Sequence, residues 1–373
     1  MSGVNRTTRS GRPDAAGANL LAVRSHNTAL VLDLLRTAGA DGISRLELAA
    51  RTGLTPQAVS KITARLREEG LAAEAGRRAS TGGKPATVLR LVPEAGHAVG
   101  LQLDRDELRA VLVDLDGTVV GERQGGLDLG AGAAAVLGAA AALVGELREE
   151  ISEEVLGVGV AAPGPLDHVH GVLHRVTGFP EWDGFPLRDA LAERLGVPVV
   201  VDKDSNAAAL GLAVGGEGGS FAYLHLGTGL GAGLVIGDSV HRGARTGAGE
   251  FGHQVIQLDG PPCHCGNRGC IEALCLAAVD RADPEEAARV LGAGAANLAA
   301  LLDIDLVLLG GRTIAAAPET FVRGVADVLD ARARREGSLG TTVPVRLAPG
   351  SDRRVAEGAA QLLLAPLFGR ADG

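Results

Sequence analysis

Three of the four cysteines and one histidine occur close together, in the order His253, Cys263, Cys265, Cys270. Thiolate and imidazole are ligands that tetrahedral Zn²⁺ prefers, and four protein ligands leave no coordination position open for a substrate. Reduced cysteines can also be buried simply as small hydrophobic residues. The turn-forming Cys-Gly-Asn between the ligands favours the metal. The spacing therefore predicts a structural zinc site in the segment 253–270.

The remaining cysteine, Cys275, has the sequence surroundings of a helix core residue. So few thiols, most of them assigned to metal, are typical of a reducing compartment. The basic start of the chain leads into no apolar signal-peptide segment, and glycine and charge interrupt the longest apolar runs. We therefore expect a cytoplasmic protein that has no membrane partner.

The net charge of −9 is unevenly distributed. Residues 1–92 carry 14 Lys and Arg against 7 Asp and Glu, a net of +7, so residues 93–373 carry a net of −16. A basic head on an acidic body indicates a module that binds a polyanion, attached to one that does not. A solvated basic surface is the alternative, and charge alone does not exclude it.

The basic region contains the pattern of three short helices. An arm rich in Gly and Arg, residues 1–18, is predicted to be flexible. The segment 20–39 then places Leu30, Leu34 and Leu35 on one apolar stripe and ends at a glycine, as a first helix would.

Two capped helices follow. Ser44 and Glu47 form a capping box, which begins a second helix that runs to Gly53. Thr55 caps a third helix with Pro56 at its first position. Two helices joined by a short glycine turn predict a helix-turn-helix. The apolar residues that the third helix turns inward are Val59, Ile62 and Leu66.

The third helix is the one that enters the major groove in a helix-turn-helix. Gln57 could pair with adenine, whereas Lys61 is better placed for a phosphate. Residues 71–92 predict two strands around a basic glycine-rich loop, a wing that adds backbone contacts. A helix-turn-helix used only for packing is the less favoured alternative. The predicted contacts to double-stranded DNA are Thr55, Gln57, Ser60, Lys61, Arg65, Arg77, Arg78 and Lys84.

The boundary of the winged helix-turn-helix is predicted at residues 19–92, with a ligand-binding body at 93–373. In the body, Asp116 and Gly117 give a hairpin signal between two apolar alternating segments. Further strand-like segments alternate with alanine-rich helical ones. The pattern predicts an α/β body of two lobes with a cleft.

The body resembles the ROK family of repressors and sugar kinases, which belongs to the actin-like, hexokinase-like ATPase superfamily. The resemblance rests on LGTGLGAGLVIGDSVHRGARTGAGEFGH at 226–253 and on CHCGNRGCIE at 263–272. The head is similar to the winged helix-turn-helix of ROK repressors, which ROK kinases lack. The resemblance thus implies the same fold for nearly the whole chain.

One kinase feature is absent. ROK kinases hold ATP phosphates with a glycine-rich turn at the start of the body, where a side chain would block close approach. Here the stretch 103–107 has no glycine, and Asp106 and Glu107 would each oppose a triphosphate by on the order of 4 kcal/mol at about 4 Å. A second phosphate loop, Gly227–Gly231, remains. We therefore predict a sensor that is not an enzyme, the alternative being an ATP-dependent sugar kinase with an added DNA-binding head.

The family's sugar site is partly retained, and the resemblance implies ligand contacts at Gly164, Lys203, Asp204, Glu250, His253 and Glu272. Asp204 occupies the position of the kinase catalytic base, a vestigial one if phosphoryl transfer is lost. Sugar-binding relatives have asparagine at the positions of Gly178 and Lys203. Lys203 therefore suggests an anionic effector, whereas an ion pair with Asp202 or Asp204 is the favoured alternative.

Together these features predict a sugar-responsive DNA-binding regulator that acts as a repressor. A homodimer or homotetramer on a palindromic operator is expected, because such heads read two-fold related half-sites. Zinc would hold the ligand contacts of the second lobe in register. A protein controlled by a protein partner, with a vestigial ligand site, is a further alternative.

Overall fold

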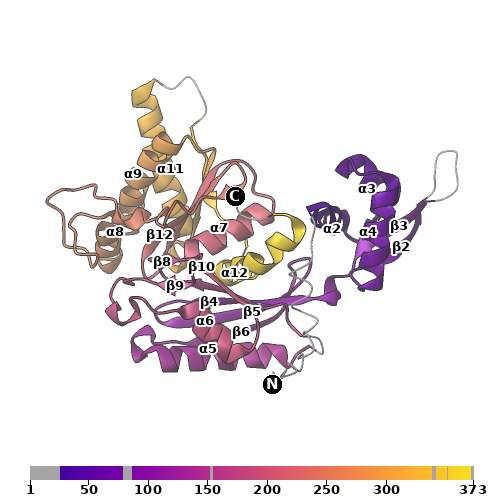
Figure 1. Cartoon of the computed structure of the whole chain (residues 1–373). Coiled ribbons are helices and arrows are strands. Elements are labelled where there is room, and N and C mark those ends of the chain that lie inside the picture. The colour runs from indigo at the N-terminus through magenta and orange to yellow at the C-terminus, as the bar shows by residue number, and fades with distance from the viewer. Residues whose placement is uncertain (1–25, 79–85, 152–153, 338–341, 351, 371–373) are drawn as a thin grey trace, which may run out of the picture.

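The structure is a computed structural model (Figure 1), and it describes residues 26–78, 86–151, 154–337, 342–350 and 352–370. The predicted arm at 1–18 and Lys84 lie outside these residues. No helix in the described part of the chain is long and apolar enough to cross a membrane.

The head, residues 26–91, is a winged helix-turn-helix. Its capping box is present, because Ser44 Oγ accepts from the Glu47 amide and the Glu47 carboxylate accepts from the Ser44 amide. The buried stripe of the first helix is shifted from the predicted one: Val31 and Leu32 are fully buried beside Leu35, whereas Leu30 and Leu34 are half-buried. The elements are α2 (His26–Ala38), α3 (Arg45–Thr52), α4 (Pro56–Glu68), β1 (Ile43–Ser44), β2 (Ala72–Arg78) and β3 (Ala86–Leu91), with antiparallel strands in the order β1-β3-β2.

The first lobe of the body is a mixed five-stranded sheet in the order β10-β7-β4-β5-β6. The predicted hairpin at Asp116–Gly117 joins β5 to β6, with Gly117 at a φ of 84° that favours glycine. Helices α5 and α6 bury apolar residues against one face of this sheet. The elements are β4 (His97–Leu103), β5 (Glu107–Asp114), β6 (Val119–Gly126), β7 (Val158–Ala162), β8 (Leu166–Asp167), β9 (Val172–Leu173), β10 (Val199–Lys203), α5 (Ala133–Arg148) and α6 (Leu187–Leu195).

The second lobe is a five-stranded sheet in the order β13-β12-β11-β14-β15. One face packs on α8, α9 and α11, where alanine and leucine form a large core (Figure 1). The elements are β11 (Phe221–Leu226), β12 (Leu230–Ile236), β13 (Ser239–Val240), β14 (Leu306–Gly310), β15 (Val345–Leu347), α8 (Ile271–Asp280), α9 (Pro284–Leu302), α10 (Arg312–Ala316) and α11 (Pro318–Glu336). The short 3₁₀ helices of the chain are Gly39–Asp41, Pro93–Ala95, Leu129–Ala131, Pro180–Trp182, η5 (Phe251–His253) and η6 (Ala365–Phe368).

Helices α7 (Asp204–Val214) and α12 (Arg354–Leu364) connect the two lobes. They pack on each other, α12 also on β4 and β7 and α7 also on β12. A Cβ at Gly100 would collide with the carbonyl oxygen of Ala356, and one at Gly358 with that of Ala207. Glycine permits this close approach. The two helices therefore form a tightly packed layer between the sheets.

The head and the body share one hydrophobic core. Val31 and Leu35 of α2 belong to the same buried cluster as Leu363 and Phe368 of α12 and η6. The Arg36 guanidinium lies 4.8 Å from the centroid of the Phe368 ring, where a cation is attracted to the aromatic face. The C-terminal part of the body thus holds the first helix of the head in place.

Candidate functional site

The N-terminal part of α4 presents polar side chains to solvent. Gln57, Ser60 and Lys61 are exposed, while Val59 on the opposite face is fully buried. Thr55 is also exposed, and its hydroxyl accepts from the Ala58 amide at 3.2 Å, which caps the helix. The exposed face is the one that a helix-turn-helix places in the major groove.

Arg65 has a different environment from these residues. Its Nη2 donates to the Thr28 hydroxyl at 2.8 Å, and its Nε lies 3.7 Å from a Glu69 carboxylate oxygen. The bond to Thr28 ties α4 to α2, whereas the contact with Glu69 lies within the end of α4. Arg77 and Arg78 are the last residues of β2, the first strand of the predicted wing.

The predicted metal ligands lie together. One atom from each of His253, Cys263, Cys265 and Cys270 falls within 4.8 Å of the others. The Cys263 sulfur is 3.7 Å from His253 Nδ1, and the Cys265 and Cys270 sulfurs are 3.8 Å apart. The chain turns back between them, with the Gly266 amide donating to the Cys263 carbonyl at 3.0 Å. Four soft ligands at these separations could hold a metal ion.

The thiols of this cluster have raised pKa values. Burial and the neighbouring thiols raise the pKa of Cys270 to about 12, and burial also raises that of Cys263. A cation would therefore have to displace protons from them. The cluster lies at the start of α8, because Cys270 is the N-cap residue of that helix. It thereby links Glu272 in α8 to His253 in η5.

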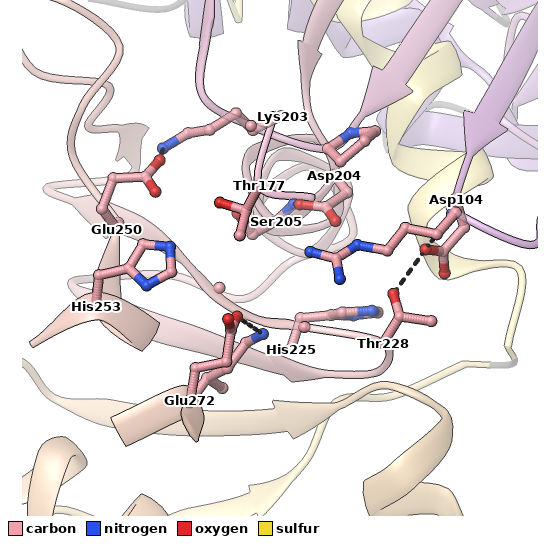
Figure 2. A pocket seen from close by; sticks show the side chains of 17 residues that line it. Asp104, Thr177, Lys203, Asp204, Ser205, His225, Thr228, Glu250, His253 and Glu272 are labelled. Atoms are coloured by element: carbon pink, nitrogen blue, oxygen red, sulfur yellow. Dashed lines mark hydrogen bonds and ion pairs between the residues drawn. The ribbon is translucent and has the colours of Figure 1, made fainter. Parts of the chain in front are cut away.

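A cleft between the two lobes contains all six predicted ligand residues (Figure 2). The first lobe contributes Gly164 and Lys203 from the ends of β7 and β10, and Asp204 from the start of α7. The second lobe contributes Glu250, His253 and Glu272. The cleft is also lined by residues that were not predicted from the sequence as ligand contacts: Asp104, Arg105, Thr177, Ser205, His225 and Thr228.

Lys203 pairs across the cleft with Glu250. Its side chain is 3% exposed, and Nζ lies 3.0 Å from Glu250 Oε1 and also donates to the Ala248 carbonyl. The prediction that Lys203 forms an ion pair with Asp202 or Asp204 was wrong. Neighbouring strand residues point to opposite faces, and Asp202 pairs instead with Arg242 at 2.6 Å.

Asp204 and Glu272 have distinct environments in the same cleft. Burial, with a contribution from Asp104, raises the pKa of Asp204, although His225 opposes the shift. Glu272 is 6% exposed, and its carboxylate accepts from the Leu230 amide at 2.8 Å. That bond holds the start of β12, so one oxygen of Glu272 is engaged within the protein.

Comparison with known proteins identifies the family. Residues 98–282 match the ROK family model, and residues 31–72 match a winged helix-turn-helix DNA-binding model. The ROK hexokinase from Thermus thermophilus is 30% identical, and the match covers 74% of this chain and 99% of that chain with a TM-score of 0.60. The chain belongs to the ROK family. The expected fold, a winged helix-turn-helix on a hexokinase-like body, is confirmed.

Two further relatives of this ROK protein carry a regulatory description. The xylose repressor of Caldicellulosiruptor bescii is 31% identical over 236 residues, which are 62% of this chain and 59% of that protein. The chain thus spans about three-fifths of the length of the curated relatives it matches. A ROK family transcriptional regulator, a homologue of the Escherichia coli MLC protein, has the same fold, with a TM-score of 0.74 over 93% of this chain and 98% of that chain at 21% identity.

In this ROK protein the stretch 103–107, where the resemblance places the family's first phosphate loop, forms a tight turn between β4 and β5. The Asp104 amide donates to the Glu107 carbonyl at 2.9 Å, and the Arg105 and Asp106 carbonyls accept from amides of the segment 127–129. The Arg105 amide also donates, to Asp104 Oδ1 at 2.7 Å, so the amides of Asp104 and Arg105 are both engaged, whereas a phosphate loop presents free amides.

The acidic residues of the turn are paired, which corrects the repulsion expected at 103–107. Asp106 receives two hydrogen bonds, at 3.1 and 3.0 Å, from Arg312 of the second lobe. Glu107 pairs with Arg109 at 2.9 Å. Because both carboxylates have a cation beside them, they present far less negative charge to a ligand than unpaired ones would.

Proposed function

We propose that this ROK protein is a DNA-binding transcriptional repressor whose body binds a sugar or sugar derivative and thereby changes the affinity of the head for an operator. The observation that carries the proposal is the shared core of head and body. It joins an exposed DNA-reading face to the helix layer that borders the sugar cleft. The relative described as a xylose repressor supports the same function.

The path from ligand to DNA would run through the two connecting helices. Asp204 lines the cleft and begins α7, α7 packs on α12, and α12 continues into η6, which contacts α2. A change in the closure of the two lobes would therefore move α12 and η6, on which α2 of the head packs. Couplings of this kind are typically about 1 to 3 kcal/mol.

At the operator, Gln57 would read a base edge and Lys61 would contact phosphate, with Thr55 and Ser60 beside them. Arg77, Arg78 and Lys84 would place the wing along the DNA backbone. A homodimer or homotetramer would bind a palindrome with half-sites one or more helical turns apart. Arg65, which bonds Thr28, would support the recognition helix rather than contact DNA.

The metal cluster fits a structural Zn²⁺. Three sulfurs and one imidazole nitrogen match its preferred donors, and they fill all four tetrahedral positions. Zinc there would hold Glu250 and Glu272 at fixed positions along the cleft, because η5 and α8 both adjoin the cluster.

We infer that phosphoryl transfer is absent, since the β4–β5 turn has no free glycine amides for a triphosphate. The alternative is a sugar kinase with a DNA-binding head, which Asp204 and the loop Gly227–Gly231 favour. ADP formation with any hexose, lost in Asp204→Asn, would support the kinase instead.

The decisive experiment is selection of bound DNA from the fragmented source genome, followed by anisotropy titration of the selected site at fixed salt. The expected result is a specific palindrome whose affinity changes at least fivefold with one sugar or sugar derivative. Failure to select any specific site at physiological salt would overturn the proposal.

A further inference from the structure

The turn at 103–107 contacts the second lobe at two points. Asp104 Oδ1 accepts a hydrogen bond from the Thr228 hydroxyl at 2.9 Å. Asp106 accepts two from the Arg312 guanidinium, at 3.1 and 3.0 Å. Thr228 belongs to the loop between β11 and β12, and Arg312 is the first residue of α10. One short turn of the first lobe therefore holds two separate elements of the second lobe, and these two contacts are termed the clasp.

The turn that carries the clasp is itself held in shape by the first lobe. The Asp104 amide donates to the Glu107 carbonyl at 2.9 Å, and the Leu127 amide donates to the Asp106 carbonyl at 3.0 Å. Among the described residues, no backbone hydrogen bond joins the turn to the second lobe. Only side-chain contacts therefore have to break for the turn to leave the second lobe.

Buried ion pairs join the two lobes at the other end of the cleft. Arg242 Nε lies 2.6 Å from Asp202 Oδ2, and the two side chains are 6% and 2% exposed. Lys203, whose side chain is 3% exposed, pairs with Glu250 at 3.0 Å. Figure 2 shows this second pair at the opposite end of the cleft from the Asp104–Thr228 bond.

The two ends differ in how easily they separate. The side chains of Arg312 and Asp106 are 48% and 56% exposed, so water can solvate both charges when the pair breaks. Exposed ion pairs contribute little to stability. Breaking a buried pair such as Arg242–Asp202 leaves an uncompensated charge away from water, which costs much more. Less free energy is therefore needed to separate the lobes at the clasp than at the buried pairs.

We propose that the clasp is the opening edge of the cleft: the lobes move apart at the turn 103–107 and stay joined at the buried pairs of Lys203 and Arg242. Asp104 and Thr228 line the cleft, so breaking their contact gives access to it from this end. The strength of the Asp106–Arg312 pair then sets the population of the open form. This inference goes beyond the proposed function, because the opening occurs in the protein alone, without effector or DNA.

The test is hydrogen exchange of the full chain without ligand, measured by mass spectrometry. Asp106→Arg places two cations against each other at the clasp. We expect about fivefold faster exchange in the loop 226–231, which Asp106 itself does not bond, and unchanged exchange at 241–250. Combining it with Arg312→Asp restores an ion pair of reversed sense and should recover at least half of the change.

A second readout is the rate at which diethyl pyrocarbonate modifies His225, which lines the cleft. The rate should rise about fivefold in Asp106→Arg, whereas the exposed His264 should react at the same rate in all variants. The milder Asp106→Asn should raise both the exchange at 226–231 and the His225 rate about two- to fivefold, and it serves if the charge-reversed variant does not fold.

Arg289→Glu is the matched control, because Arg289 forms the same two-bonded pair with Glu286, at 2.7 Å for each bond, within α9 alone. It should change neither readout. Unchanged exchange at 226–231 in both Asp106 variants would overturn the clasp, as would faster exchange confined to 103–107. Exchange at 241–250 that rises as much as at 226–231 would show that the lobes separate at both ends, which contradicts a single opening edge.

Discussion

Lys203 Nζ and Glu250 Oε1 lie 3.0 Å apart and join the two lobes across the cleft between them. Lys203 ends β10 in the first lobe, and Glu250 precedes η5 in the second (Figure 2). The lysine is almost fully buried, whereas the Glu250 side chain is 37% exposed. The ion pair therefore occupies a carboxylate that would otherwise be able to accept from a sugar hydroxyl.

Replacing Lys203 with asparagine should release that carboxylate. We expect Lys203→Asn to bind neutral glucose or xylose at least fivefold more tightly in calorimetry, because Glu250 becomes free to accept a hydroxyl hydrogen. Urea unfolding should show a loss of about 1 to 3 kcal/mol, since buried hydrogen bonds are removed. Lys61→Asn, a control in the head, should change neither property. Unchanged affinity for neutral sugars in the cleft variant would show that Glu250 is not a sugar contact.

The residues that line the cleft were predicted from the sequence more accurately than the ion pairs that they form. The family resemblance implied that Asp204, Glu250 and Glu272 share one site, and all three line the cleft. The Lys203–Glu250 pair joins residues far apart in the sequence, and it depends on which way β10 faces. The partners predicted for Lys203 were its sequence neighbours Asp202 and Asp204. Because side chains alternate along a strand, Asp202 points to the opposite face of β10 from Lys203.

The turn at 103–107 illustrates the same limit of prediction from sequence. The sequence showed that the turn at 103–107 lacks glycine, and charge counting suggested that acids would dominate it. Arg312, which is distant in the sequence, pairs with Asp106, and Arg109, two residues further along β5, pairs with Glu107. The helix caps of the head were predictable because Ser44–Glu47 and Thr55 act within one helical turn.

Removal of the metal should destabilise the second lobe. We expect about one Zn²⁺ per chain by elemental analysis, loss of that metal in Cys265→Ser, and a lower melting temperature after treatment with a strong chelator. Cys275→Ala is the matched control, because this buried cysteine lies outside the cluster and should leave the metal content unchanged. A fully metal-loaded Cys265→Ser protein would contradict the ligand assignment.

Zinc affinity should fall as the pH falls. The pKa of the Cys270 thiol is raised to about 12 and that of Cys263 is also raised, so both are protonated in the metal-free fold at neutral pH. Each must lose a proton when a metal binds. Competition with a chelating dye should therefore show weaker binding at pH 6 than at pH 8, with proton release in calorimetry. Binding without proton release would indicate that the thiols do not coordinate the metal.

Alkaline pH should destabilise the fold through Cys275. Burial raises the pKa of this thiol to about 12, above its ordinary value of about 8.5 in an unfolded chain. The folded protein therefore holds a proton that the unfolded chain loses, and the associated stability is full below pH 8.5 and declines toward pH 12. We expect about 3 kcal/mol of this decline by pH 10.5 in urea unfolding, and a smaller decline in Cys275→Ala. An equal decline in the variant would assign the effect to other groups.

Substitutions on α4 should distinguish residues that contact bases from residues that contact phosphates. Gln57→Ala is expected to cost about 1 to 3 kcal/mol at the operator and relax preference at one base pair. Lys61→Ala should weaken binding to all sequences and reduce the salt slope by about 1. Arg65→Ala should chiefly lower the stability of the head, because Arg65 bonds Thr28. Anisotropy titrations at several salt concentrations distinguish these cases, and identical effects of all three changes would contradict the assigned roles.

The contact of α2 with the C-terminal segment should transmit the ligand signal to the head. Arg370 Nε lies 3.0 Å from Asp33 Oδ1, and Phe368 is 2% exposed beneath Arg36. The ion pair is partly exposed and contributes little, whereas truncating the aromatic ring removes several kcal/mol of packing. We therefore expect Phe368→Ala to increase hydrogen exchange in α2 and to abolish the ligand's effect on operator affinity, with operator binding itself retained. Arg370→Ala should reduce the ligand effect only slightly. A ligand effect of full size in Phe368→Ala would place the coupling elsewhere in the fold.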